Sequence, residues 1–220
     1  MYLSRIALNV NDKHREIMRA LAWPQLLHAA VEQSCPGGGQ RNLWRIDWLG
    51  ENCYLLLLSR ARPDFTSIIE KLGYPQGRGE IKDYSPLLDR LQRGQVWRFR
   101  LRANPVRYSS SEKEKTSDRG KIFALSGVAQ QKQWLAERAE KSGFLLAPDA
   151  FDIVHTEWKN FRKTPTGKHE VKLRTVTFEG VLTISDLEVF KNSLLSGIGR
   201  AKAYGCGLMT IARAGGDDGQ

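Results

Sequence analysis

A glycine-rich segment, residues 196–209, has the composition of a phosphate-binding loop. It contains two cations, Arg200 and Lys202, among four glycines, which are Gly197, Gly199, Gly205 and Gly207. Glycine reaches positive φ at little cost and lets another backbone approach closely. Backbone N–H groups beside cations suit an anion such as a phosphate group. A turn with a purely structural purpose explains the same glycines equally well, so both readings are open at this point.

The same segment does not fit the dinucleotide fingerprint of oxidoreductases. That fingerprint needs a third glycine three residues after the second, and Lys202 stands in this place after Gly199. We also expect no βαβ unit with a ribose-binding acid to follow it. A nucleotide-dependent oxidoreductase is therefore the least favoured function class.

Residues 97–102 have the clearest strand pattern in the sequence. Apolar and basic side chains alternate along it, in the order Trp97, Arg98, Phe99, Arg100, Leu101 and Arg102. In a strand this alternation places the three arginines on one face. Like charges on one face repel each other unless an anion or solvent covers them, so the face is either solvated or directed toward RNA.

A second basic stretch, residues 159–174, contains Glu170 as its one acid and two interleaved aromatics nearby, Trp158 and Phe161. Its cations are Lys159, Arg162, Lys163, Lys168, Lys172 and Arg174. The sequence Thr-Pro-Thr-Gly at 164–167 predicts a turn, and the flanking residues have strand character, so we expect a basic β-hairpin. The alternation changes phase near Thr175, which indicates a β-bulge.

The composition favours a polyanionic partner. The chain has 220 residues, with 34 Lys and Arg against 24 Asp and Glu and a net charge of +10. Such a balance suits nucleic acid or an acidic membrane surface. The densest apolar run, 55–58, is far too short to span a bilayer, and we expect no signal peptide.

The three cysteines are Cys35, Cys53 and Cys206, and they form no C-x-x-C pair. An odd, scattered set argues against a zinc site or a disulfide framework and fits a reducing cytosol. We therefore expect a cytoplasmic protein without a zinc site or disulfides. We also expect no cofactor and no membrane partner.

The order of elements predicts an α+β fold of two tandem ferredoxin-like domains. The first half reads as strand 2–10, helices 17–21 and 25–34, strands 42–48 and 52–59, helix 65–72 and an ambiguous element at 84–91. The second half reads as strand 97–102, helix 129–141, strands from 151 to 184 that form the basic hairpin, helix 187–198 and strand 208–213. Both follow the βαββαβ order of an antiparallel, RRM-like sheet covered by two helices. We expect domains at 1–92 and 95–213 and a disordered tail at 214–220.

Four segments in register resemble the CasE family, the repeat endoribonuclease of the type I-E CRISPR complex Cascade. They are Met-Tyr-Leu-Ser at 1–4, Phe-Arg-Leu-Arg-Ala-Asn-Pro at 99–105, Phe-Glu-Gly-Val-Leu at 178–182 and the glycine-rich loop at 197–208. The resemblance covers nearly the whole chain. It implies metal-free cleavage of precursor CRISPR RNA at the base of the repeat hairpin, a basic β-hairpin in the RNA groove, and retention of the product within Cascade.

The resemblance also implies a catalytic histidine in the first helical region of the N-terminal domain, and His28 matches that position. RNA carries its own nucleophile, the 2′-OH, so histidine suffices as a proton donor or acceptor near neutral pH. The alternative is a surface pair between His28 and Glu32, one helical turn away. His14 is the rival catalytic candidate, whereas His155 and His169 lie in or beside the hairpin and fit contacts to RNA or solvent.

Two departures from the family pattern concern the surroundings of His28. Some relatives carry a tyrosine where Gln25 stands and a lysine where Gln33 stands. A non-catalytic RNA-binding subunit of the same fold is therefore the second hypothesis. Three further cations, Arg5, Lys13 and Lys202, are candidates for stabilising phosphate charge.

Overall fold

The computed structural model describes residues 1–35, 41–108, 122–162 and 170–214. Its N-terminal half contains β1 (Tyr2–Leu8), α1 (His14–Ala22), α2 (Pro24–Ser34), β2 (Leu43–Leu49), β3 (Asn52–Ser59), α3 (Thr66–Leu72), β4 (Glu80–Asp83) and α4 (Ser85–Asp89). The strands form one antiparallel sheet in the order β2-β3-β1-β4. This order, with the first and third strands in the centre, is that of a ferredoxin-like domain.

The C-terminal half repeats this arrangement. Its elements are β5 (Val96–Ala103), β6 (Val106–Tyr108), β7 (Ile122–Ala124), α5 (Val128–Ala139), η2 (Glu140–Ser142), β8 (Phe144–Leu145), β9 (Phe151–Arg162), β10 (Glu170–Ile184), α6 (Leu187–Ser196), η3 (Lys202–Tyr204) and β11 (Met209–Arg213). The sheet order is β11-β5-β10-β8, and β9 also pairs with β10. The expected α+β fold of two tandem ferredoxin-like domains is confirmed.

Local sequence signals explain where several elements begin. Pro24 is the first residue of α2, where its missing N–H costs nothing, so the chain turns between α1 and α2 at this point. Asp186 caps α6 by accepting a hydrogen bond from the Val189 N–H at 3.1 Å. The last strand of the first domain is β4, ahead of the ambiguous stretch 84–91, which is instead helical over Ser85–Asp89.

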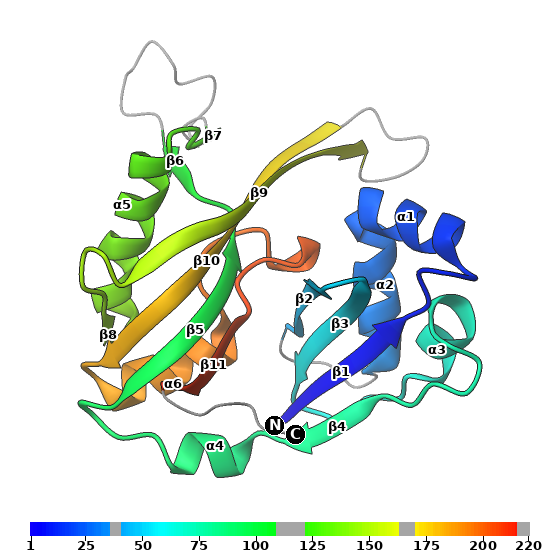
Figure 1. The fold of residues 1–220 in the computed structure, drawn as a ribbon, viewed down its shortest axis with the longest axis horizontal. Helices are drawn as coiled ribbons and strands as arrows, with labels where there is room; N and C mark the ends of the chain where they lie inside the picture. The colour runs from blue at the N-terminus through cyan, green and yellow to red at the C-terminus, as the bar shows by residue number, and fades with distance from the viewer. Residues whose placement is uncertain (36–40, 109–121, 163–169, 215–220) are drawn as a thin grey trace.

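The strands β9 and β10 form a long antiparallel hairpin whose tip, 163–169, lies outside the described residues. Its register shifts between Thr177 and Phe178, which face His155 and Ile153, so Val154 is the extra residue. The expected bulge is therefore present. Its extra residue lies on β9, and the register shift on β10 falls two to three residues after Thr175. Figure 1 shows the hairpin extending from the second domain toward α1 of the first.

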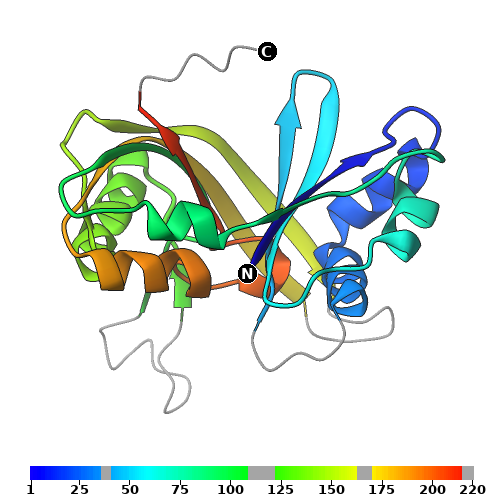
Figure 2. The same ribbon diagram turned by 90° about the horizontal axis from the view of Figure 1, so that it is seen from below.

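Each half has its own apolar core. Ile6, Val31 and Leu55 are buried in the first core, and Leu101, Phe144 and Phe190 in the second. Figure 2 shows the two halves side by side, with the hairpin of β2 and β3 between them.

A third, smaller cluster joins the halves and contains Leu43, Leu58, Tyr84 and Leu208. The domain limits at 92 and 95 stay a proposal, and Leu91, just before them, is buried in the second core. Of the proposed tail, 214–220, residues 215–220 lie outside the described part of the chain.

Candidate RNA interface and catalytic histidine

His28 lies in the middle of α2, with its side chain 25% exposed. Its Nδ1 lies 3.8 Å from Oε1 of Glu32, which is beyond hydrogen-bond distance, so the pair expected from the sequence is present but loose. This Nδ1 is buried and has no hydrogen-bond partner among the described residues. Because Nδ1 is shielded from solvent, proton exchange between His28 and a bound molecule requires the other ring nitrogen, Nε2.

The other candidates around α2 are placed differently. His14 is exposed at the first residue of α1, and His155 is exposed on β9, whereas His169 lies outside the described residues. Gln25 and Gln33 lie on α2 on either side of His28, and neither side chain makes a hydrogen bond to the rest of the described chain.

The distal part of the β9–β10 hairpin, next to its tip, is tied to the corner between α1 and α2. Lys159 Nζ donates to the carbonyl oxygen of Leu21 at 2.6 Å, and the Trp23 indole N–H donates to the carbonyl oxygen of Arg162 at 2.6 Å. Trp23 immediately precedes α2. The hairpin is thus fastened directly to the start of the helix that carries His28.

Lys159 is therefore occupied by the protein itself. Its side chain is 10% exposed, and its Nζ also lies 3.3 Å from Glu157. Burial lowers the pKa of Lys159 below its usual range, and the Glu157 carboxylate opposes this shift. In the structure, Lys159 links the two domains. A contact between Lys159 and RNA stays a prediction.

The outer part of the hairpin carries cations that are open to solvent. Arg162 and Lys172 are exposed, and Lys172 lies 3.8 Å from Glu170. The guanidinium of Arg174 lies over the ring of Trp158 at 5.3 Å, an arrangement that leaves an exposed aromatic beside a cation. Lys163 and Lys168 lie outside the described residues.

Arg100 and Arg102 of β5 are paired with acids of β2, β9 and β10. Arg100 lies 3.1 Å from Glu179 and 3.6 Å from Asp47. Arg102 forms an ion pair with Glu157 at 2.6 Å and a hydrogen bond to the Thr175 hydroxyl at 3.0 Å. The sequence alternation predicted that these arginines share one face, but it could not predict the acids opposite them. RNA contacts by Arg100 and Arg102 stay predictions.

The glycine-rich loop packs closely against both domains. All four of its glycines, Gly197, Gly199, Gly205 and Gly207, have positive φ. A Cβ at Gly205 would lie 2.7 Å from the ring of Trp44 in the first domain, and one at Gly199 would lie 3.0 Å from Trp134 in the second. The loop therefore needs glycine for structural reasons.

Several backbone amides of this loop already have acceptors. The Gly197 N–H donates to Ser193 O at 2.9 Å, that of Gly205 to Lys202 O at 3.3 Å, and that of Gly207 to Arg102 O at 2.7 Å. These three N–H groups are not free to bind phosphate. RNA contact by the glycines stays a prediction, and it would require the RNA backbone to pass close to the loop backbone.

The cations of the loop have different surroundings. The Arg200 guanidinium donates to the hydroxyl of Tyr108, whose ring is exposed. Burial lowers the pKa of Lys202, and the nearby cation of Arg41 lowers it further. Of the other two candidates for phosphate contact, Arg5 pairs with Glu80 at 2.7 Å and Lys13 donates to the Glu70 carbonyl oxygen.

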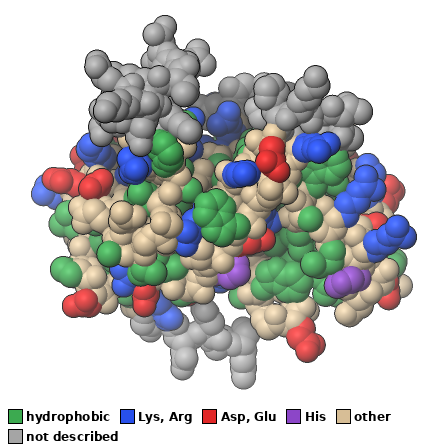
Figure 3. Space-filling view, turned by 90° about the horizontal axis from the view of Figure 1, so that it is seen from above, with side chains coloured by type: hydrophobic (Ala, Val, Ile, Leu, Met, Phe, Trp, Pro, Cys, Tyr) green, Lys and Arg blue, Asp and Glu red, His purple; other side chains and the backbone are tan. Residues whose placement is uncertain are grey.

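The helix α2, the glycine-rich loop and the end of β9 lie next to one another although they are distant in sequence. The short helix η3 of the glycine-rich loop packs against α2, and its Tyr204 contacts Phe161 of β9 edge to face at 5.0 Å. Trp23 and Tyr204 were not identified from the sequence as site residues, because no local pattern distinguishes them from core or surface residues. On the face shown in Figure 3, Lys and Arg side chains are scattered among hydrophobic and acidic side chains.

No helix in the described part of the chain is long and apolar enough to cross a membrane. Within residues 1–35, 41–108, 122–162 and 170–214, no group of three or more His, Cys, Asp or Glu side chains could hold a metal ion. The three cysteines are free and buried.

Comparison with known proteins identifies the family. The family model described as CRISPR associated protein matches residues 1–213. The CRISPR-associated endoribonuclease Cse3 of Thermus thermophilus is 31% identical over 225 residues, which cover 96% of this chain and 100% of the relative. The CRISPR system Cascade subunit CasE of Escherichia coli (strain K12) is 28% identical over 166 residues, which cover 74% of this chain and 75% of the relative.

The structural comparison agrees with this result. The structure of Thermus thermophilus Cse3 bound to an RNA representing a pre-cleavage complex matches with a TM-score of 0.77 and 28% identity, covering 96% of this chain and 98% of that one. The match extends over both ferredoxin-like domains. The chain belongs to the CasE family of type I-E CRISPR-associated proteins.

Proposed function

We propose that this protein is a metal-independent endoribonuclease that cuts precursor CRISPR RNA at the base of the repeat stem-loop and retains the product within Cascade. The observation that carries the proposal is the meeting of the basic hairpin, the glycine-rich loop and the His28 helix at one place. The relatives support it, since one is named an endoribonuclease and the other a Cascade subunit.

The reaction follows from the chemistry of RNA. The 2′-oxygen attacks the adjacent phosphorus, a base removes the 2′-OH proton, and an acid gives a proton to the departing 5′-oxygen. The products are a 2′,3′-cyclic phosphate, or a 3′-phosphate after hydrolysis, and a 5′-hydroxyl. His28 carries out one of these two proton transfers, for which a neutral or a charged imidazole is suited near neutral pH.

The surrounding cations have a separate task. Arg162, Lys172 and Arg174 of the hairpin hold the phosphates of the stem, and Lys202 of the loop lies nearer the reacting phosphate. Because the major groove of an A-form stem is narrow, the hairpin enters it near the end of the stem. Phosphate contacts of this kind make binding fall steeply with salt concentration.

The test is cleavage of a type I-E repeat stem-loop RNA in EDTA, with the products resolved on a gel. We expect the wild-type protein to make one cut in all-ribose RNA, and none in RNA with 2′-deoxyribose at the cleaved position. His28→Ala should abolish the cut but change RNA affinity by no more than a few-fold. His14→Ala is the matched control and should cut normally.

The second candidate function is a non-catalytic RNA-binding subunit of the same fold. It is favoured by Gln25 and Gln33, whose side chains make no hydrogen bonds to the described residues near His28. If the wild-type protein shifts the RNA on a native gel and cuts nothing, this second function replaces the first. In either case we expect a cytoplasmic protein whose partners are the repeat RNA and other Cascade subunits.

A further inference from the structure

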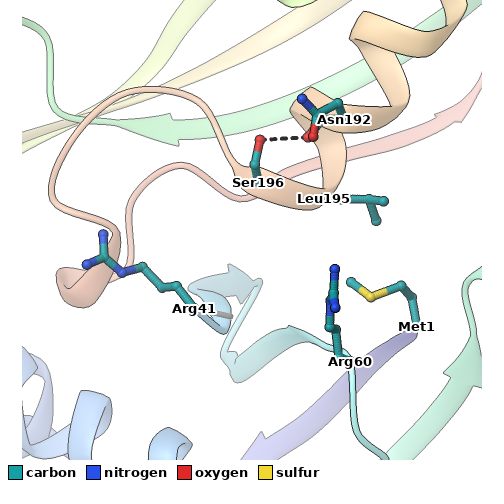
Figure 4. Close-up of a pocket in the computed structure, with 6 residues that line it drawn as sticks. All are labelled: Met1, Arg41, Arg60, Asn192, Leu195 and Ser196. Carbon is teal, nitrogen blue, oxygen red and sulfur yellow. Dashed lines mark hydrogen bonds between the residues drawn. The ribbon is translucent and has the colours of Figure 1, made fainter. Parts of the chain in front are cut away.

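A cavity of about 600 Å³ lies between the two domains. Met1, Arg41 and Arg60 line it from the first domain, and Asn192, Leu195 and Ser196 from the end of α6. Figure 4 shows the two arginines on one side of this space and the three residues of α6 on the other. Its volume is in the range that encloses a small ligand.

The charge of this cavity is unbalanced. Arg41 and Arg60 are exposed, and neither forms a hydrogen bond or an ion pair within the described part of the chain. None of the six lining residues is acidic. By contrast, Arg100 and Arg102 of β5 each have a carboxylate within 3.1 Å or less.

A third cation adds to this imbalance. Lys202 of η3 is half-buried, and the charge of Arg41 opposes its own. Like charges that are held together and partly shielded from water cost free energy, and a bound anion removes that cost. Because η3 packs against α2, the three cations form a path that starts beside the His28 helix and ends in the cavity at Arg60.

The other lining residues suit a nucleobase. Met1 and Leu195 offer apolar surface to its face, and the side-chain amide of Asn192 has no partner among the described residues and can reach its edge. Unpaired bases, in contrast to the bases of a stem, expose both the face and the edge to such contacts.

We propose that this cavity binds a single-stranded segment of RNA that flanks the repeat stem, with Arg41 and Arg60 on its phosphates. The inference rests on the proposed function only in taking the repeat RNA as the ligand. The cavity then acts as a second binding subsite, which adds affinity for the flank without contacting the stem.

The experiment measures the dissociation constant of the full-length protein for repeat RNA that has 2′-deoxyribose at the cleaved position. Four forms are compared: the stem-loop alone, with a 5′ flank, with a 3′ flank, and with both. The variants are the doubles Arg41→Glu/Arg60→Glu and Arg41→Gln/Arg60→Gln. Arg78→Glu is the charge control for the glutamine double variant, because both lower the net charge by two and Arg78 is also exposed and unpaired within the described residues.

We expect a flank to improve wild-type affinity at least tenfold and the double variants to lose this improvement. The affinity of Arg41→Gln/Arg60→Gln for the bare stem-loop should match that of Arg78→Glu. The arm that shows the gain identifies which flank enters the cavity. The proposal is overturned if neither flank adds affinity, or if the double variants lose as much affinity for the bare stem-loop as for flanked RNA.

This readout is separate from cleavage. If wild-type protein fails to cut all-ribose RNA but binds the flank through Arg41 and Arg60, the catalytic function fails and the subsite stands. If it cuts but the flank has no effect, the subsite fails and the catalytic function stands.

Discussion

Arg45 and Asp47, two residues apart on β2, form a buried two-pronged ion pair that joins the domains. Nε and Nη2 of Arg45 donate to the two carboxylate oxygens of Asp47 at 2.8 and 2.7 Å. Its Nη1 donates across the domain boundary, to the carbonyl oxygens of Arg100 at 2.8 Å and Leu208 at 3.1 Å. Burial lowers the pKa of Arg45, and the Asp47 carboxylate opposes this shift, so the charge of Arg45 depends on its partner.

Breaking this pair should destabilise the protein strongly. Asp47→Ala leaves a buried cation without its counter-charge, which costs about 3–5 kcal/mol of unfolding free energy. Denaturant unfolding measures the loss, and Asp149→Ala, at an exposed aspartate, should change stability by less than about 0.5 kcal/mol. The double variant Arg45→Met/Asp47→Leu should be more stable than Asp47→Ala, because it removes both charges. Equal losses at Asp47 and Asp149 would contradict the assigned role.

The hydrogen bond from Trp23 to the Arg162 carbonyl should matter for the cleavage rate. Trp23→Phe keeps an aromatic ring and removes the donor, so the hairpin is no longer fastened to the start of α2. We expect the single-turnover rate at saturating protein to fall roughly tenfold, since small displacements of a catalytic group are costly, and RNA affinity to change less than about threefold.

Trp48→Phe is the matched control for this variant. The Trp48 side chain is 46% exposed, and its indole makes no hydrogen bond to the described residues, so neither rate nor affinity should change. A Trp23→Phe protein that cuts at the wild-type rate would show that the link has no role in positioning His28.

The exposed hairpin cations should govern affinity and its salt dependence. Lys172→Glu combined with Arg174→Glu places negative charge against phosphate, so we expect binding to weaken more than tenfold. The slope of log affinity against log salt should become shallower by about two. The control is Lys71→Glu with Lys82→Glu, which makes the same charge change at two exposed lysines of the first domain. Equal losses of RNA affinity in both double variants would show that net charge, and not the position of the hairpin cations, determines binding.

Gly205 of the glycine-rich loop can be compared with Gly50 of the turn between β2 and β3, because both have positive φ. Gly205 has φ +77°, and an added Cβ would lie 2.7 Å from the Trp44 ring, whereas Gly50 has φ +59° with nothing within 4 Å. Gly205→Ala should therefore cost about 2–4 kcal/mol, from backbone strain and overpacking together, and Gly50→Ala about 1 kcal/mol. Thermal or denaturant unfolding measures both, and equal costs would mean that the loop yields to the added methyl group.

Cys53 should make stability depend on alkaline pH. Burial, and secondarily the Asp47 charge, raise the pKa of its thiol to about 12. The unfolded thiol ionises near pH 9 and the folded one does not, so the thiol's contribution is complete below pH 8 and declines as pH rises. The stability difference between wild type and Cys53→Ala should thus shift by about 2 kcal/mol against wild type between pH 7.5 and 10.5. A difference that is constant with pH would contradict the raised pKa.

Most of the architecture could be predicted because its signals are local. The alternation in 97–102 identified β5, and the turn sequence after Arg162 identified the β9–β10 hairpin. The stretch 84–91 was ambiguous although Pro86 stands in the first turn of α4, where proline favours a helix start. The sequence therefore does contain a local signal for this helix.

The surroundings of the site could not be predicted in the same way. The acids that neutralise Arg102 and Arg100, Glu157 and Glu179, are far from them in sequence, and only the pairing of β5 and β9 with β10 brings them together. Similarly, Arg41 and Arg60 have no pattern of their own, and they meet the end of α6 only because the two domains pack together.

The position of β2 has a consequence for the behaviour of the isolated first domain. β2 ends the strand order of its sheet, and residues 43–47 are nevertheless all buried, since the second domain lies against them. A free sheet edge with such a sequence is a template on which other chains can add strands and aggregate. The second domain therefore shields this edge in the intact chain, and we expect the first domain alone to aggregate.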